Sequence, residues 1–304
     1  MIGVGNMRIL LTNHHFFNFG GTENYTMGLA RALTALGHSV DIYVVTKQDK
    51  MPAYDFFKTK YSGIGWFIER VPPNQYDLIL MNHSTSIEKL KKHRGYKIFT
   101  SHGLPGIEVP VPGADHYVFI SPELFSKYPK YKNKSIIKTG FSIGDFEEFT
   151  FEEPLVNPTA LLIDYAPITT STNTFTSTCK RIGVWSEIFS IKNINPLGMR
   201  QVFKGFDIMC ATGRTALESA LYGKRTIVYG HFGADGVLKP ELDKCNFSGR
   251  YTNNLISFEE SLRSVLSSSK KSVDVMRKYL KKERDIELSC KKYLKIYEEN
   301  RNGY

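Results

Sequence analysis

Residues 206–238 read FDIMCATGRTALESALYGKRTIVYGHFGADGVL, and the pattern of this stretch predicts the fold. A short apolar run at 206–210 is typical of a buried strand, and apolar residues at helical spacing follow at 214–222. Gly223 ends that helix, and a second apolar run at 225–229 predicts another strand. A strand, a glycine turn, a helix and a strand form one βαβ unit, which predicts a parallel sheet.

The turn of this βαβ unit is suited to an anion. The amino end of a helix presents unpaired backbone N–H groups and the positive end of the helix dipole, which attract phosphate groups. We therefore expect Gly213, Arg214 and Thr215 to bind the diphosphate of a nucleotide-bearing ligand. Glu218 lies one turn further along, where its carboxylate can accept hydrogen bonds from sugar or ribose hydroxyls.

The run GRTALESALYGKRTIVYG at 213–230 is similar to the donor-binding segment of retaining glycosyltransferases of the GT-B fold, the glycosyl transferases group 1 type. In that family a glutamate of this segment holds the ribose of a nucleotide-sugar, and Glu218 stands at the matching position. The resemblance thus implies that Glu218 belongs to the catalytic site. The segment GADG at 233–236 resembles a family loop that contacts the donor sugar, which adds Asp235 to the expected donor-binding residues.

The start of the chain has the same order of elements. A strand is predicted at 8–12, followed by the loop NHHFFNFGG at 13–21. A helix is predicted at 23–36 with Thr22 as its N-cap, and a strand at 39–46. This is a second βαβ unit, so the two halves of the chain are predicted to have similar folds.

The order of a strand, the sequence GGTE, a helix and a strand resembles the opening of the same family. Glycines allow the backbone to come close to a ligand. The resemblance implies that Gly20 and Gly21 approach the donor diphosphate or the acceptor.

Two histidines follow predicted strands of the first half. His83 follows a strand at 77–81, and His102 follows a strand at 97–100. Ligands of open α/β sheets bind at the carboxyl ends of the strands. The sequence SHG around His102 matches a family motif, which implies that His102 contacts the sugar and is catalytic. We expect His83 to give structural support.

The second half begins with a predicted strand at 159–164, followed at 165–178 by a Thr- and Ser-rich stretch that we predict to be a long polar loop. The family places basic residues after this strand to neutralise the diphosphate. The candidates here are Lys180 and Arg181, with the pair Arg200 and Lys204 as the alternative.

The predicted fold class is α/β: a GT-B fold, with two Rossmann-like domains facing each other across a cleft. We predict an N-terminal, acceptor-side domain at 1–150 and a donor-nucleotide domain at 151–285. An acidic, proline-containing linker is expected at 147–158. A single long basic helix is predicted at 273–299, and its end, at 286–304, is expected to pack back on the N-terminal domain.

Composition limits the partners and the location. The 304 residues carry a formal net charge of +10, which favours phosphate-rich partners such as a nucleotide, a nucleic acid or an anionic membrane face. No apolar run approaches the roughly 20 residues that a membrane span needs. Four dispersed cysteines favour reduced thiols and a cytoplasmic location over a zinc site. Residues 1–6 lack the pattern of a signal peptide, and Met1 and Met7 are alternative starts.

The expected function is a retaining hexosyl- or pentosyltransferase that moves a sugar from a nucleotide-sugar donor to a saccharide, a lipid-linked glycan or another hydroxyl acceptor. No D-x-D motif is present, and we expect neither a metal nor another cofactor. The aromatic and basic stretch at 54–67 keeps a modified DNA base open as the acceptor. The sequence is also compatible with a nucleotide-sugar epimerase or hydrolase, and with a non-catalytic nucleic-acid-binding protein that retains the fold.

Overall fold

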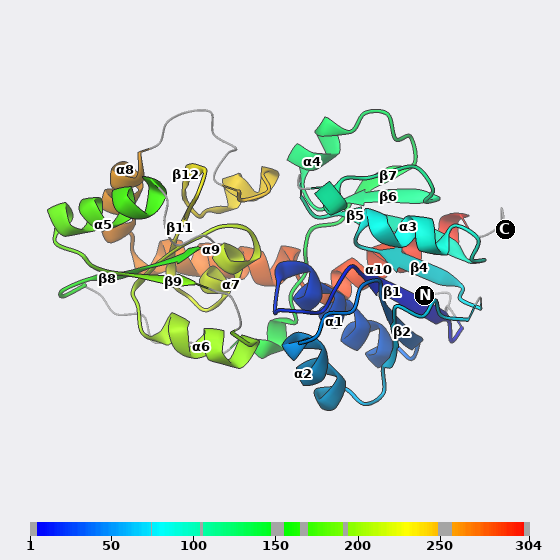
Figure 1. The fold of residues 1–304 in the computed structure, drawn as a ribbon. Coiled ribbons are helices and arrows are strands. Elements are labelled where there is room, and N and C mark those ends of the chain that lie inside the picture. Colours follow the sequence, from blue (N-terminus) through cyan, green and yellow to red (C-terminus); the bar gives the residue numbers. More distant parts are fainter. Residues whose placement is uncertain are drawn as a thin grey trace. The chain divides into compact units, whose positions relative to one another are not determined.

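The computed structural model describes residues 5–73, 75–103, 106–146, 155–164, 170–190, 194–248 and 257–300 (Figure 1). The chain divides into two compact units. Unit 1 comprises Met1–Ser142 together with Arg284–Tyr304, and unit 2 comprises Ile143–Glu283. The division at residue 142 precedes the position expected from the sequence, and most of the expected linker at 147–158 lies outside the described residues.

Unit 1 is built on a seven-stranded sheet with the strand order β3-β2-β1-β4-β5-β6-β7, in which every pairing is parallel. The strands are β1 (Arg8–Asn13), β2 (Ser39–Val44), β3 (Gly65–Ile68), β4 (Leu78–Met81), β5 (Tyr96–Ser101), β6 (His116–Phe119) and β7 (Lys134–Ile136). The chain runs outward from β1 in one direction and then from β4 in the other. The topological switch point, where open α/β sheets bind ligands, therefore lies between β1 and β4.

Both faces of this sheet are covered, which explains why its central strands are continuous apolar runs. On β1, Ile9 and Leu11 belong to one buried cluster and Leu10 belongs to another. The helices of unit 1 are α1 (Gly21–Ala35), α2 (Pro52–Lys60), α3 (Ser84–Leu90), α4 (Pro122–Lys127) and α10 (Ile286–Asn300), with a 3-10 turn η1 (Gly106–Glu108). The last helix, α10, packs against α1 from the start of the chain (Figure 1).

Two tyrosines tie α10 into the core of unit 1. The hydroxyl groups of Tyr25 on α1 and Tyr293 on α10 lie 3.2 Å apart, and the Tyr293 hydroxyl lies 2.7 Å from Thr100 Oγ1 on β5. Both tyrosines are fully buried, and burial raises the pKa of each phenol, so the hydroxyl groups stay protonated and hydrogen-bonded. The end of the chain is thus part of the core of the first sheet.

Unit 2 is built on a five-stranded sheet with the order β12-β11-β10-β8-β9, parallel except for β12. Its strands are β8 (Thr159–Asp164), β9 (Trp185–Ser190), β10 (Ile208–Ala211), β11 (Arg225–Gly230) and β12 (Gly233–Val237). Its helices are α5 (Thr170–Ile182), α6 (Pro196–Lys204), α7 (Gly213–Leu221), α8 (Phe258–Leu266) and α9 (Lys270–Glu283), with 3-10 turns η2 (Ile143–Asp145) and η3 (Pro240–Lys244). The βαβ unit predicted at the start is confirmed, because β10 and β11 flank α7 and pair in parallel.

Three local predictions are wrong. The loop predicted at 165–178 is in part the helix α5, because Phe175 and Cys179, at i and i+4, are buried and override the low helix propensity of Ser and Thr. The single helix predicted at 273–299 is two helices, because the backbone at Arg284 and Ile286 hydrogen-bonds to Phe141 in place of the helical pattern. The N-cap of α1 is Gly20 rather than the predicted Thr22.

All four cysteines are buried free thiols. None of the helices among the described residues is long and apolar enough to cross a membrane. Likewise, no three His, Cys, Asp or Glu side chains of the described ranges are grouped so that they could hold a metal ion.

Candidate functional site

Four histidines lie in the loops at the switch point of unit 1. His14 and His15 follow β1, His83 follows β4, and His102 follows β5. These strands are neighbours in the sheet, so their carboxyl ends meet at one edge. The ring centroid of His14 lies 5.5 Å from that of His15 and 6.2 Å from that of His83. We refer to these four side chains as the histidine cluster.

His15 is paired with a buried carboxylate. Its Nδ1 atom lies 2.8 Å from Oε1 of Glu23, a residue that is 1% exposed, whereas the His15 side chain is 31% exposed. We treat the contact as an ion pair. Thr22 Oγ1 donates a 3.1 Å hydrogen bond to the other carboxylate oxygen. The contact with Glu23 raises the pKa of His15, although burial opposes the shift.

Gly20 makes room for this carboxylate. A Cβ atom at Gly20 would collide with Oε2 of Glu23, while its backbone, at φ −68°, is in a conformation open to any residue. The sequence led us to expect that Gly20 and Gly21 approach a ligand, and the structure places Gly20 against Glu23 and Gly21 at the exposed start of α1. The fourth residue of the GGTE sequence is thus a site candidate that the sequence analysis missed.

Gly20→Ala should therefore displace the Glu23 carboxylate while leaving the fold intact. We expect the pKa of His15, followed by NMR titration, to fall toward its ordinary value as the ion pair is broken. Gly63→Ala is the matched control, because a Cβ there meets nothing within 4 Å. An unchanged His15 pKa in Gly20→Ala would show that Glu23 does not hold the imidazole.

His102 is positioned by a buried amide. Its Nε2 atom lies 2.9 Å from Oδ1 of Asn82, which is 1% exposed. The amide nitrogen of Asn82 donates to the Thr12 carbonyl oxygen at 3.1 Å and to Thr26 Oγ1 at 2.8 Å. Because both amide hydrogens are used, Oδ1 must accept, and Nε2 of His102 carries the proton. The rings of His102 and Tyr25 also pack edge-to-face, with 5.2 Å between centroids.

His83 has a structural contact, in line with its expected role. It is 3% exposed, and its Nδ1 atom accepts a 3.1 Å hydrogen bond from the backbone N–H of His14. Burial lowers the pKa of His83 to about 2, with the neighbouring histidines as a smaller cause. A neutral His83 therefore joins the loops that follow β1 and β4.

A second carboxyl group lies near this cluster. Burial raises the pKa of Glu108 to about 7, and the charge of Glu23 contributes to the same shift. Ser101 Oγ, at the end of β5, donates a 2.9 Å hydrogen bond to the Glu108 carbonyl oxygen and so anchors this segment. The raised pKa of Glu108 comes from burial and from Glu23, so no pattern in the sequence indicated it.

In unit 2 the turn between β10 and α7 is compact. Gly213 has φ +55°, a left-handed conformation that favours glycine, and its N–H donates a 2.7 Å hydrogen bond to the Phe247 carbonyl oxygen. A Cβ at Gly230, the last residue of β11, would lie 2.7 Å from Thr212 Cγ2. The Gly213 amide, expected to bind an anion, therefore has a partner within the protein, which leaves Arg214 and Thr215 as the expected phosphate contacts in this turn.

Glu218 is held by Arg214 in the first turns of α7. Arg214 Nε lies 2.7 Å from Glu218 Oε1, and the two side chains are 15% and 20% exposed. Arg200 on α6 hydrogen-bonds to the buried Tyr222. Burial raises the pKa of the Tyr222 phenol, and the positive charge of Arg200 acts in the opposite direction. Glu218 also acts electrostatically on Tyr222, so Arg200 lies in the same part of unit 2 as the Arg214–Glu218 pair.

The other expected basic pair is elsewhere. Lys180 and Arg181 lie in the last turn of α5, which leads to the amino end of β9, whereas Gly213 follows the carboxyl end of β10. The sheet therefore separates them from the start of α7, and Arg181 pairs with Glu259 on α8. The pair was expected at the diphosphate because the family places basic residues after the strand at 159–164, and the stretch at 165–178 was predicted to be a loop. Lys204 is the last residue of α6, which leads to the amino end of β10, so it also lies away from the start of α7.

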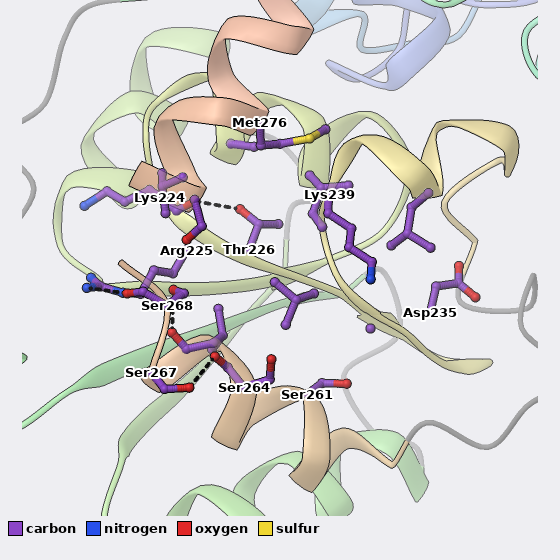
Figure 2. Close-up of a pocket in the computed structure, with 18 of the residues that line it drawn as sticks. Lys224, Arg225, Thr226, Asp235, Lys239, Ser261, Ser264, Ser267, Ser268 and Met276 are labelled. Atoms are coloured by element: carbon purple, nitrogen blue, oxygen red, sulfur yellow. Dashed lines mark hydrogen bonds between the residues drawn. The ribbon is translucent and has the colours of Figure 1, made fainter. Parts of the chain in front are cut away.

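Asp235 lies on β12 and is 1% exposed. It is among the residues that line a pocket between β12 and α8 (Figure 2), and neither Arg214 nor Glu218 belongs to that lining. Asp235 and the Arg214–Glu218 pair are therefore not parts of one described pocket.

Solved glycosyltransferases have a similar fold. A glycosyltransferase from Rickettsia africae superposes with a TM-score of 0.64 at 15% identity, over 97% of this chain and 99% of that one. An alpha-glucosyltransferase in complex with UDP and a 13-mer DNA containing an HMU base gives 0.65 at 12% identity, over 96% and 100%. A lipopolysaccharide outer core galactosyltransferase gives 0.63 at 12% identity, over 95% and 99%.

No protein-family model and no curated protein matches the sequence. The structural likeness extends over nearly the whole chain, and the predicted α/β class with two Rossmann-like domains of the GT-B type is confirmed. At these identities, the likeness is one of fold.

Proposed function

We propose that the protein is a glycosyltransferase that moves a sugar from a nucleotide-sugar to a hydroxyl acceptor. The observation that carries this proposal is the Arg214–Glu218 pair, in the first turns of α7, on a chain that shares its fold with glycosyltransferases over nearly its whole length. The carboxyl edge of an α/β sheet is where such folds bind nucleotides. A carboxylate held at this edge suits ribose or sugar hydroxyls.

In this proposal unit 2 binds the donor. Glu218 accepts hydrogen bonds from ribose hydroxyls, and Arg214 keeps the carboxylate in place. Of the four basic candidates Lys180, Arg181, Arg200 and Lys204, we assign Arg200 to the diphosphate, because it and Glu218 both act on Tyr222. Its guanidinium stabilises the charge that develops on the leaving group, usually the largest contribution to such catalysis. We propose that these arginines suffice without a metal, so that activity persists in EDTA.

Unit 1 binds the acceptor in this proposal. His15 accepts the proton of the acceptor hydroxyl, and Glu23 orients the imidazole and stabilises its charged form. His102, with its proton held on Nε2 by Asn82, contacts the sugar through its other ring atoms. A cytoplasmic location is also proposed, supported by the four buried free thiols.

The proposal is tested with a panel of nucleotide-sugars that differ in base and sugar. One donor should raise the melting temperature far more than the others, since a ligand that binds only the folded state stabilises it. Transfer from that donor is then followed by NMR, and we propose that the anomeric configuration is retained. No response to any member of the panel would overturn the proposal. Inversion of the anomeric configuration would overturn the proposed retention and indicate a single displacement.

A modified DNA base is the second candidate acceptor. It is supported by a basic, aromatic surface on α2, where the ammonium group of Lys58 lies 5.2 Å from the ring centroid of Tyr54. The ammonium group of Lys60 lies 5.5 Å from the ring centroid of Phe56 and 5.6 Å from that of Tyr61. Aromatic rings stack on unpaired bases, and lysines contact phosphates.

Lys58→Glu with Lys60→Glu should weaken DNA binding and lower its salt dependence, because removing one lysine–phosphate interaction reduces the slope of log K against log salt by about 0.9. Fluorescence anisotropy with duplex DNA at several salt concentrations measures this slope. Lys89→Glu, in the last turn of α3, is the control. Equal slopes for the double variant and the control would leave a saccharide or lipid-linked glycan as the acceptor.

A further inference from the structure

A pocket of about 770 Å³ opens within unit 2, between α8, the start of α9, η3 and the strands β11 and β12 (Figure 2). This volume is within the range of about 300–1,000 Å³ that is usual for small-molecule sites. We call it the α8–α9 pocket. Its lining combines an apolar wall with serines, cations and carboxylates, and neither Arg214 nor Glu218 belongs to it.

The α8–α9 pocket is separate from the proposed donor site. It contacts the first residues of β11, Arg225 and Thr226, whereas α7 begins beside Gly230, at the other end of that strand. Five residues of strand span about 16 Å. Ala220 of α7 lines the pocket, but it points about 160° away from Glu218 around the helix, because successive residues are about 100° apart.

The serines of the pocket present oxygen atoms that accept hydrogen bonds. Ser261 Oγ donates its hydrogen to the Ser257 carbonyl oxygen at 3.2 Å, Ser268 Oγ to that of Val265 at 2.7 Å, and Ser272 Oγ to that of Ser269 at 2.7 Å. A hydroxyl whose hydrogen is used in this way meets a ligand through its lone pairs. Such oxygens suit a ligand with several hydroxyl groups.

The charged side chains suit a ligand with one anionic group. The lining holds Lys224, Arg225 and Lys239 against Asp235 and Glu260, an excess of one positive charge. Arg225 is 4% exposed and donates a 3.4 Å hydrogen bond to the Ser268 carbonyl oxygen, so its guanidinium group is held in the wall of the pocket.

Lys239 is the cation best placed to meet a ligand. Figure 2 shows its side chain extending from the end of β12 towards α8, which carries Ser261 and Ser264. Within the part of the chain that the structure describes, its ammonium group has no hydrogen bond or ion pair. Val265, Val273 and Met276 are buried and form the apolar wall.

We infer that the α8–α9 pocket binds a small phosphorylated sugar. Lys239 binds the phosphate, the serine oxygens accept hydrogen bonds from the sugar hydroxyls, and the apolar wall contacts the C–H face of the ring. This inference rests on the lining of unit 2 and does not require the proposed transferase activity. It gives unit 2 a second ligand site, whose lining includes neither Arg214 nor Glu218.

Isothermal titration calorimetry of the full chain tests the inference with glucose 6-phosphate, ribose 5-phosphate, glucose and inorganic phosphate. We expect one of the sugar phosphates to bind with 1:1 stoichiometry, and at least about tenfold more tightly than glucose or inorganic phosphate. Failure of both sugar phosphates to bind, or equal affinity for inorganic phosphate alone, would overturn it.

Variants place the binding in this pocket. Lys239→Gln should raise the Kd of the sugar phosphate by about tenfold or more, since the variant cannot make the charge-assisted hydrogen bond to the phosphate. Lys244→Gln, at an exposed position of the same 3-10 turn outside the lining, should change it less than about twofold. Ser264→Trp, at an exposed position of α8, should block the site, and Glu218→Gln should leave it unchanged. Equal weakening in Lys239→Gln and Lys244→Gln, or weaker binding in Glu218→Gln, would contradict the assignment.

Discussion

Replacing His15 with alanine should lower kcat by about 10²- to 10⁴-fold, the usual contribution of a positioned acid or base. The imidazole is held at the switch point of unit 1 by the buried carboxylate of Glu23, 2.8 Å away, and is partly exposed, as a proton acceptor must be. Donor affinity should be unchanged, because unit 2 binds the donor in our proposal. Steady-state kinetics with the donor found in the panel measures both quantities.

The pH dependence of the same reaction identifies the pair. The base must be neutral, so kcat rises as the pH increases through the pKa of His15, which Glu23 raises. In Glu23→Gln this limb should move to lower pH and the maximal rate should fall, because the pairing charge is removed. His93→Ala, which removes a histidine outside the cluster, is the control. If kcat falls no more in His15→Ala than in His93→Ala, His15 is not the proton acceptor, and the leaving phosphate takes the proton instead.

Glu218→Gln should weaken binding of the nucleotide-sugar by about 10- to 100-fold, since a hydrogen bond to a charged group contributes about 1.5–3 kcal/mol. The substitution keeps the shape of the side chain and removes the charge that Arg214 holds in place. Melting temperature without ligand should change little, because the pair is partly exposed and lies on the surface of one helix. Calorimetric titration of the donor measures the affinity.

A matched variant separates a direct role in donor binding from the mere removal of an ion pair. Glu259→Gln removes a carboxylate that pairs with Arg263 at i,i+4 on α8, outside the proposed donor site. It should leave donor affinity unchanged. Equal donor affinity in Glu218→Gln and the wild type would remove Glu218 from the site and, with it, the observation on which the proposed function depends.

Local patterns were enough to predict the two βαβ units. The apolar runs at β1, β10 and β11, and the glycines beside them, set the strands and turns without reference to distant residues. They were not enough for α5, where Ser and Thr disfavour a helix and burial of Phe175 and Cys179 stabilises it. Nor did they indicate the break between α9 and α10, since the hydrophobic spacing continues across it.

For the candidate site, sequence patterns were enough to place His102, the Gly20–Gly21 loop, and the segment of Arg214 and Glu218 beside the ends of strands. Only the folded chain shows which of these residues have partners. Glu23 and Glu108 were not recognised, because their properties come from burial and from neighbouring charges. The structure also shows that Lys180 and Arg181 lie in the last turn of the helix α5, away from the start of α7. Spacing along the chain specifies local conformation, whereas burial and charge pairing depend on residues far apart in sequence, and only the folded chain brings those together.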